Sequence, residues 1–429
     1  MSDNEAPEAA AQLQFGPFAA LHYRDFRLFW IGLFISNVGT WMQMTAISWL
    51  LYELTNSPLQ LGLNGVFRAI PAIGLGLFGG TMADRYDRKR LMLITQVTSM
   101  LLAFALGILA QTERIEVWQI YGLTVVSAVV GTLDGPARHA LYPSLVPRDL
   151  LPNAIALNSL LWKGTALLGP SLAGIAISMI GTDGAFYANA LSFLAVVFAL
   201  ACMRTTSRSG ASPGHFMHEL KEGVSYVAAQ EIILGLMVME AVSSVFGLDQ
   251  AILTIFARDI LQVGASGLGF LQSARGLGAV IGSVFLISMD RRRSHGTILL
   301  FSAALYSASF VLFGLSHSFA ISLMLLLLMG ATDTIWAAAR NMILQFHMPE
   351  RMRGRVMGVF HLSNRGLHPL GQTETGLVVP LIGARGTTVL GGLVVAAVTL
   401  LITWKVPSLP GFRWEERTEP APFDAGDPD

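Results

Sequence analysis

Long apolar runs separated by short polar segments are the dominant pattern of this 429-residue chain. Each run supplies the roughly 20 residues that a helix needs to cross a hydrocarbon core about 30 Å thick. The runs lie at about 27–53, 59–82, 91–111, 117–140, 152–180 and 184–203, and then at about 231–257, 267–288, 297–315, 319–345, 354–381 and 386–406. The pattern predicts an all-α membrane protein with twelve transmembrane helices in two pseudo-symmetric six-helix bundles.

Polar segments divide the chain into five expected parts. These are an N-terminal tail at 1–24, a first bundle at 25–204, a linker at 205–230, a second bundle at 231–406 and a C-terminal tail at 407–429. The last tail is rich in proline and acidic residues, so we expect it to be disordered. Within the linker, His218–Val227 predicts an amphipathic helix on the membrane surface, with a simple flexible tether as the alternative. The N-terminal tail lacks the basic start of a signal peptide, so we expect the first span to be retained.

Composition agrees with lipid as the main solvent of this chain. Hydrophobic residues make up 53% and charged residues only 13% of the sequence. The formal net charge is zero, which gives no indication of a nucleic-acid partner. The single cysteine, Cys202, cannot form an internal disulfide.

Basic residues in the short polar segments predict how the chain is oriented, because loops on the cytoplasmic side carry an excess of Lys and Arg. Alternate segments are basic, and they hold Arg85, Arg88, Lys89 and Arg90; Arg138 and Arg148; Arg204, Arg208 and Lys221; Arg291–Arg293; and Arg351, Arg353 and Arg355. The other segments hold little beyond Arg114, Arg258 and Arg385. We therefore expect both termini in the cytoplasm.

An internal repeat relates the two halves of the chain. Residues 136–147 align with residues 338–349 at an interval of 202, since 338 − 136 = 202. The same interval places Lys163 on Arg365, so a cation recurs about halfway along two equivalent helices. Because duplicated transporter halves place the binding site between them, the repeat also indicates where to look for function.

A second interval, 207, aligns Leu61 and Gly62 with Leu268 and Gly269 and places Arg68 on Arg275. Both arginines lie about nine residues into their helices, roughly 13 Å deep at about 1.5 Å per residue. Acids recur as well, because span four carries Asp134 and span ten carries Asp333, which miss the 202 interval by three residues.

Buried charges in a membrane need an explanation, because each costs about 3 kcal/mol on insertion scales. One interpretation is structural, with the cations paired to acids that lock the two halves together; those acids are Asp134, Glu240, Asp249, Asp333 and Glu374. The other is a central cavity that selects an anionic or phenolic substrate. The candidate cavity residues are Arg68, Arg275, Lys163, Arg365, Asn37 and Gln43.

Proton coupling would require a carboxylate for which substrate and proton compete. The candidates are Asp134, Asp249 and Asp333. Each could equally be a fixed ion-pair partner. Three histidines, His139, His361 and His368, could titrate near neutral pH, although isolated histidines of this kind are usually hydrogen-bonded structure.

Several motifs resemble the major facilitator superfamily. The turn from Gly80 to Arg90 is similar to the cytoplasmic signature between spans two and three of that superfamily. The stretches Asn37–Gln43, Leu54–Pro58 and Pro136–Arg138 resemble its bacterial branch that contains the enterobactin exporter and macrolide efflux proteins. The resemblance covers most of the chain and implies a transporter that works by alternating access.

The resemblance also implies roles for individual residues. It assigns a cytoplasmic gate to Gly80, Asp84, Arg85, Arg88, Arg138 and Arg340. It assigns an antiporter-like helix to Gly164, Gly169, Pro170 and Gly174, with an ordinary small-residue packing seam as the alternative. The second-half turn retains Asp290 but not the first acid, so gating is expected to depend on the first half.

We therefore expect a secondary transporter of the bacterial inner membrane that exports a small organic molecule in exchange for protons. An anionic siderophore-like or aromatic-acid compound is the favoured substrate class. Efflux of neutral hydrophobic compounds of the multidrug or macrolide kind, and uptake of a small organic anion, remain alternatives. The chain shows neither a clustered catalytic set nor a Gly-rich nucleotide-binding loop, so we expect no enzyme activity, no cofactor and no metal. The expected partners are substrate, protons and lipid, and the expected state is a monomer.

Overall fold

The computed structural model describes residues 16–85, 87–204, 216–288 and 294–412. The part of the chain before the linker contains η1 (Ala19–His22), α2 (Arg24–Thr55), α3 (Pro58–Arg85), α4 (Arg88–Gln111), α5 (Val117–Leu141), η2 (Tyr142–Ser144), η3 (Arg148–Leu150) and α6 (Leu151–Cys202). The rest contains α7 (Phe216–Ala229), α8 (Glu231–Phe246), α9 (Gln250–Ile255), η4 (Phe256–Ile260), α10 (Gly264–Ser288), α11 (His295–Leu315), α12 (Phe319–His347) and α13 (Glu350–Lys405). Every described element is helical, which confirms the all-α prediction.

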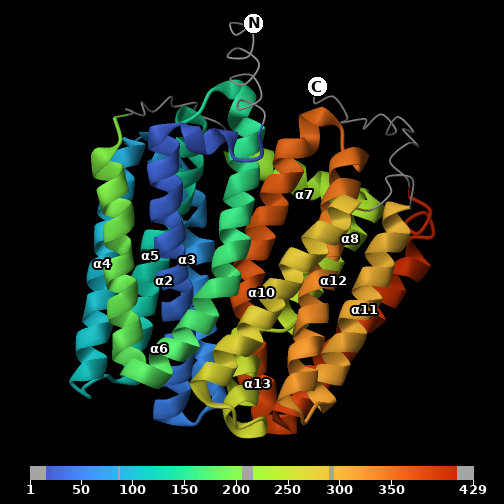
Figure 1. Ribbon diagram of the computed structural model, residues 1–429. Helices are drawn as coiled ribbons and strands as arrows, with labels where there is room; N and C mark the ends of the chain where they lie inside the picture. The colour runs from blue at the N-terminus through green and yellow to red at the C-terminus, as the bar shows by residue number, and fades with distance from the viewer. Residues whose placement is uncertain (1–15, 86, 205–215, 289–293, 413–429) are drawn as a thin grey trace, which may run out of the picture.

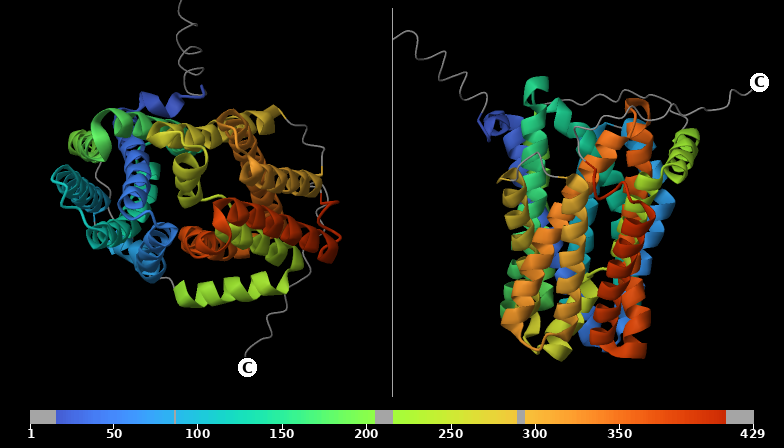
Figure 2. Two further views of the ribbon diagram at one scale, coloured as in Figure 1. Left: turned by 90° about the horizontal axis from the view of Figure 1, so that it is seen from below. Right: turned by 90° about the vertical axis from the view of Figure 1, so that its right-hand side faces the viewer.

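Eight of the described helical stretches are long and apolar enough to cross a membrane. Large apolar side chains on the outside of the molecule suit contact with lipid; Ile287, Leu381 and Met179 are 86%, 80% and 77% exposed. The described ends of the chain, η1 and the segment after α13, lie toward the same end of the bundle (Figure 1). The long helices are roughly aligned, whereas α7 lies at the side of the bundle (Figure 2).

Two helices are far longer than a bilayer requires, and each is divided by a glycine. In α6, of 52 residues, Gly181 has φ 78° and ψ 176°; in α13, of 56 residues, Gly383 has φ 75° and ψ 162°. Positive φ is tolerated by glycine because it has no Cβ. Since 383 − 181 = 202, the two breaks fall at equivalent places of the repeat. Both helices therefore consist of two helical segments joined at matching positions.

The apolar run expected at 231–257 is not one continuous helix. Helix α8 ends at Phe246, and α9 starts at Gln250 after the extended residues Gly247 and Asp249. The Asp249 carboxylate caps α9 by accepting a hydrogen bond from the Ile252 N–H at 2.8 Å. After α9 the backbone continues as the π-helical turn η4. Hydropathy alone misses this break, because the residues around Gly247 are mostly apolar.

Contacts between helices form two groups with two extensive connections and some smaller ones between them. Helices α2 to α6 contact one another, as do α8 and α10 to α13. The extensive connections are α3 with α13 and α6 with α10, and α9 makes smaller contacts with α2 and α3. Glycine allows close approach at both: a Cβ on Gly62 would lie 2.7 Å from the Gly376 Cα, and a Cβ on Gly269 would lie 3.1 Å from the Gly174 Cα. The intervals are 269 − 62 = 207 and 376 − 174 = 202, so the two crossings are equivalents under the repeat.

Candidate functional site

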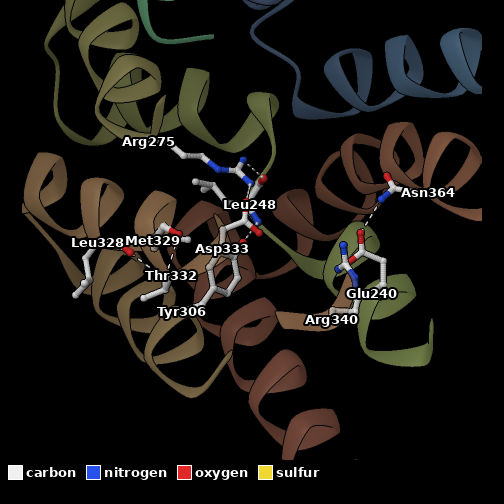
Figure 3. A network of polar contacts seen from close by, with 10 residues as sticks. All are labelled: Glu240, Leu248, Arg275, Tyr306, Leu328, Met329, Thr332, Asp333, Arg340 and Asn364. Carbon is white, nitrogen blue, oxygen red and sulfur yellow. Dashed lines mark hydrogen bonds and ion pairs between the residues drawn. The ribbon is translucent and has the colours of Figure 1, made fainter. Parts of the chain in front are cut away.

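At the break between α8 and α9, in the middle of the bundle, the Leu248 carbonyl accepts a hydrogen bond from a charged side chain. Arg275 of α10 donates from Nη1 to the Leu248 carbonyl at 3.2 Å, and its Nη2 forms an ion pair with Asp333 Oδ2 of α12, also at 3.2 Å. The Leu248 N–H donates to the Tyr306 hydroxyl at 3.4 Å. Figure 3 shows the Arg275 guanidinium directed at both partners, with Tyr306 beside them. The Arg275 and Asp333 side chains are 32% and 41% exposed, so other groups can reach this pair.

Asp249, next to Leu248, is held more tightly than Asp333. Besides the α9 cap, its Oδ2 accepts a hydrogen bond from Thr375 Oγ1 at 2.7 Å. The residue is 7% exposed. The Asp249 carboxylate therefore holds the start of α9 against α13.

A second buried ion pair has all its described partners within the same group of helices. Arg340 forms an ion pair with Glu240, and Asn364 Nδ2 donates to the other Glu240 oxygen at 2.6 Å. The Arg340 guanidinium also lies 4.9 Å from the centre of the Phe360 ring. Figure 3 shows Glu240 between Arg340 and Asn364. This arrangement is typical of a structural ion pair.

The equivalent arginine in the first group, Arg138, has a different acid. Its Nη2 contacts Asp134 Oδ2 at 2.6 Å, one helical turn away, and its guanidinium lies 5.6 Å from the Trp162 ring centre. Thr95 and Gln96 donate to Asp134 Oδ1 at 3.0 and 2.8 Å. The repeat suggested Asp134 and Asp333 as counterparts. Asp134, however, pairs with an arginine of its own helix, whereas Asp333 pairs with an arginine of a neighbouring helix.

Arg68 is half-buried on α3, and it has no hydrogen bond or ion pair with any residue that the structure describes. It lies one turn beyond Gly65, where a Cβ would meet Gln372 Cβ of α13 at 2.8 Å. On the same helix α13, His368 interacts electrostatically with Arg275, Arg68 and Asp333. Arg68 and Arg275 therefore both lie within electrostatic range of His368 on α13.

The other expected cavity residues occupy different places. Lys163 of α6 donates to Ser283 Oγ of α10, so it connects the two groups of helices. Gln43 Oε1 accepts from Asn189 Nδ2 at 2.6 Å, which ties α2 to the second segment of α6. Asn37 is 6% exposed, and its Nδ2 finds no partner in the described part of the chain. The Arg365 side chain lies outside the described residues.

The expected gate is only partly covered by the structure. The surroundings of Gly80 and the side chains of Asp84 and Arg85 lie outside what the structure describes. Arg88 donates from Nη1 to the Ala140 carbonyl at 3.0 Å, which connects the start of α4 to the end of α5. Arg340 takes part in the Glu240 network instead of a contact near a helix end.

The antiporter-like segment packs against both groups of helices. A Cβ on Gly169 would meet the Val38 carbonyl of α2 at 3.1 Å, and a Cβ on Gly164 would meet the Phe34 ring at 3.4 Å. Gly174 and the buried Pro170 face α10 at Gly269. The small residues thus permit close crossings here, as both interpretations of this segment require.

Sequence reasoning missed the Leu248 carbonyl and the Tyr306 hydroxyl as partners around Arg275. The glycine at 247 was the available signal for the break, because glycine inside an apolar run weakens a helix. Nothing in the sequence pattern selects Tyr306 from the other tyrosines.

Comparisons with known proteins agree on the kind of molecule. A family model described as a transmembrane secretion effector matches residues 15–420. An uncharacterized MFS-type transporter of Bacillus subtilis, YfiS, is 24% identical over 368 residues, which cover 81% of this chain and 85% of that protein. The enterobactin exporter EntS of Shigella flexneri is 26% identical over 387 residues, which cover 88% of this chain and 91% of that protein. A solved POT family transporter in complex with 5-aminolevulinic acid has a TM-score of 0.74 at 14% identity, covering 92% of this chain and 98% of that one; it is similar in fold alone.

Proposed function

The chain belongs to the transmembrane secretion effector family of major facilitator transporters, and from that premise we propose that it exports a small organic anion across the bacterial inner membrane in exchange for protons. It is a multi-span membrane transporter and not an enzyme. The enterobactin exporter among its relatives supports export as the direction. The proposed location places both termini in the cytoplasm, as the distribution of basic residues predicts.

The proposed architecture is two six-helix bundles that rock against each other. Eight stretches qualify as spans, two of them are double segments divided at Gly181 and Gly383, and α2 and α3 complete the set, so 8 + 2 + 2 = 12. The equivalent glycine crossings of α3 with α13 and of α6 with α10 support a pseudo-twofold relation between bundles 25–204 and 231–406. In this proposal the path runs between the bundles by alternating access.

The observation that carries the proposed cargo class is Arg68. A cation at this depth is costly, and Arg68 has no acidic partner in the part of the chain that the structure describes. Arg275 has Asp333 as its ion-pair partner and Asp249 within electrostatic range, so of these two arginines Arg68 is the one without a paired acid in the described part of the chain. A negatively charged cargo would supply the missing counter-charge.

Asp333 is the proposed proton-coupling group. It contacts a candidate cargo-binding cation, and its side chain is 41% exposed, whereas the Asp134 side chain is 11% exposed and Asp249 is buried, and each of these two accepts several hydrogen bonds. A cargo anion and the Asp333 carboxylate would both be attracted to the Arg275 guanidinium. This competition is the proposed link between cargo and protonation.

The test compares metabolites inside and outside cells of a strain that lacks this gene. The strain is complemented with wild type, with Arg68→Ala, or with the matched control Arg353→Ala, which removes an exposed arginine. We expect an anionic compound to accumulate inside the deletion strain, and wild type and Arg353→Ala to clear it at least tenfold better than Arg68→Ala at equal membrane levels. If Arg68→Ala clears everything that wild type clears, the anion site is wrong, and neutral hydrophobic efflux becomes the better proposal.

A further inference from the structure

One cluster of contacts joins the two groups of helices at the end of the bundle away from η1. Helix α2 runs from the η1 end to the opposite end, where η4 also lies (Figure 1). There the Tyr52 hydroxyl donates to the Asp259 carboxylate. Arg258 donates from Nη1 to the Tyr52 carbonyl at 2.6 Å, and its guanidinium lies 5.1 Å from the Tyr52 ring centre. Tyr52 is thus bound through its backbone, its ring and its hydroxyl at once.

The repeat places this cluster on the pseudo-twofold axis. Tyr52 and Asp259 are separated by 259 − 52 = 207 residues, the same interval that relates Gly62 to Gly269 and Arg68 to Arg275. A contact between equivalent residues of two related units must lie at or near the axis that relates them. Any path between the two bundles follows that axis, so this contact lies across the path.

A second contact between the groups lies deeper along α2. Thr45 Oγ1 donates to Gln272 Oε1 of α10 at 2.7 Å. Thr45 precedes Tyr52 by seven residues, which is about 10 Å along a helix. The bundles are therefore joined through about two helical turns of depth at this end.

The π-helical turn explains how one segment holds Tyr52 from two sides. In η4 the Leu261 N–H bonds to the Phe256 carbonyl at 2.7 Å, five residues back. The wider turn presents Arg258 and Asp259, which are consecutive, to the carbonyl and the hydroxyl of the same tyrosine. Single π-turns within helices often mark functional positions.

We propose that Tyr52, Arg258 and Asp259 form a latch that closes the translocation path at the end of the protein opposite the chain termini. This inference rests on the proposed alternating-access function. Asp259 is already exposed, whereas Tyr52 is 4% exposed, so opening would expose mainly the tyrosine to water. Because water can replace the lost hydrogen bonds, the latch can open and close reversibly.

The experiment measures the opening of this end by pulsed electron paramagnetic resonance. Spin labels are attached to Arg114→Cys and Leu315→Cys in a Cys202→Ser background; both positions are exposed, one after α4 and one at the end of α11. The C-terminal ends of α4 and α11, next to these sites, belong to different groups of helices and lie at the latch end (Figure 1). We expect wild type to show one predominant short distance.

Tyr52→Phe should raise the ratio of long to short distances about tenfold or more, the effect of losing one hydrogen bond to a charged group. Asp259→Ala, a change at an exposed residue, should do the same, and the double variant should add little to either single one. The matched control is Tyr187→Phe, which removes a hydroxyl that donates to Gln111 Oε1 at 2.7 Å within the first group. It should leave the distances unchanged.

The distances are measured without cargo, so this result is independent of the proposed substrate. If Tyr52→Phe and Asp259→Ala both match Tyr187→Phe, the cluster is a static contact and the latch is wrong, even if anion export is observed. If the distances change as expected but no anion is exported, the latch stands and the cargo class is wrong.

Discussion

Replacing Gly62 with alanine tests the close crossing of α3 and α13. A Cβ at this position would lie 2.7 Å from the Gly376 Cα and 2.9 Å from the Gln372 carbonyl oxygen. Both obstacles are backbone atoms, so no side-chain rotation can relieve the contact. Because carbon atoms pack at about 3.5–4.0 Å, the two helices would have to separate by about 1 Å. Overpacking of this kind costs about 1–3 kcal/mol.

The matched control is Gly74→Ala on the same helix, where a Cβ would meet nothing within 4 Å. Alanine is favoured over glycine inside a helix by about 1 kcal/mol, and this term is common to both variants. We therefore expect Gly62→Ala to be about 1–3 kcal/mol less stable than Gly74→Ala. The equivalent variant Gly269→Ala, opposed by the Pro170 carbonyl and Gly174, should behave like Gly62→Ala.

The assay is thermal unfolding in detergent, followed by a transport measurement on the same preparations. Gly62→Ala and Gly269→Ala should unfold at lower temperature than Gly74→Ala and should slow transport, since both crossings join the two groups of helices. Equal unfolding temperatures for Gly62→Ala and Gly74→Ala would refute the close backbone contact, on which the expected loss of stability is based.

Three further predictions concern charged side chains and their partners. Glu240→Gln leaves the nearly buried Arg340 without its counter-charge and should cost about 3–5 kcal/mol, whereas the double variant Glu240→Gln/Arg340→Met should recover much of that loss in unfolding measurements. Asp333→Asn should leave the protein folded but make the transport rate insensitive to an imposed pH gradient; an unchanged pH response would exclude Asp333 as the proton site. Lys163→Met removes the bond to Ser283 between α6 and α10 and should change transport by less than about threefold if Lys163 is scaffold; a larger loss, comparable with that of Arg68→Ala, would place it in the cargo site.

The helices and the repeat could be predicted from sequence because both depend on patterns along the chain. The 202 interval predicted from residues 136–147 also relates Gly181 to Gly383, and the 207 interval also relates the glycines at the two crossings. The helical course of α8 to η4 was predicted less well, since Gly247 interrupts it where hydropathy stays high.

The choice of partner for each charge could not be predicted, because it depends on the rotation and spacing of helices. Asp134 and Asp333 look alike in sequence, yet Asp134 binds Arg138 of its own helix, whereas Asp333 binds Arg275 of a neighbouring one. Tyr52 and Asp259 carried a signal that was not used: they are equivalent under the repeat, and both stand near the end of a predicted span.

The repeat also shows where Arg68 lacks a partner, and this gives a direct test of the anion site. Arg275 is balanced by Asp333, and the 202 interval places Asp333 on residue 131, which is a glycine of α5. Helices α3 and α5 are neighbours, as the contact of Asn64 with Thr124 at 3.2 Å shows. A Cβ on Gly131 would meet nothing within 4 Å, so a side chain can start there without a clash.

Gly131→Asp should therefore give Arg68 the counter-charge that its equivalent already has. We expect normal folding and membrane levels but at least a tenfold loss of anion export, because the new carboxylate would compete with cargo for the same guanidinium. The control Gly131→Asn has the same size without the charge and should retain export. If Gly131→Asp exports the anion as well as Gly131→Asn does, the excess charge on Arg68 does not bind cargo, and the reason for an arginine at this depth must be sought in the packing of α3 against α13.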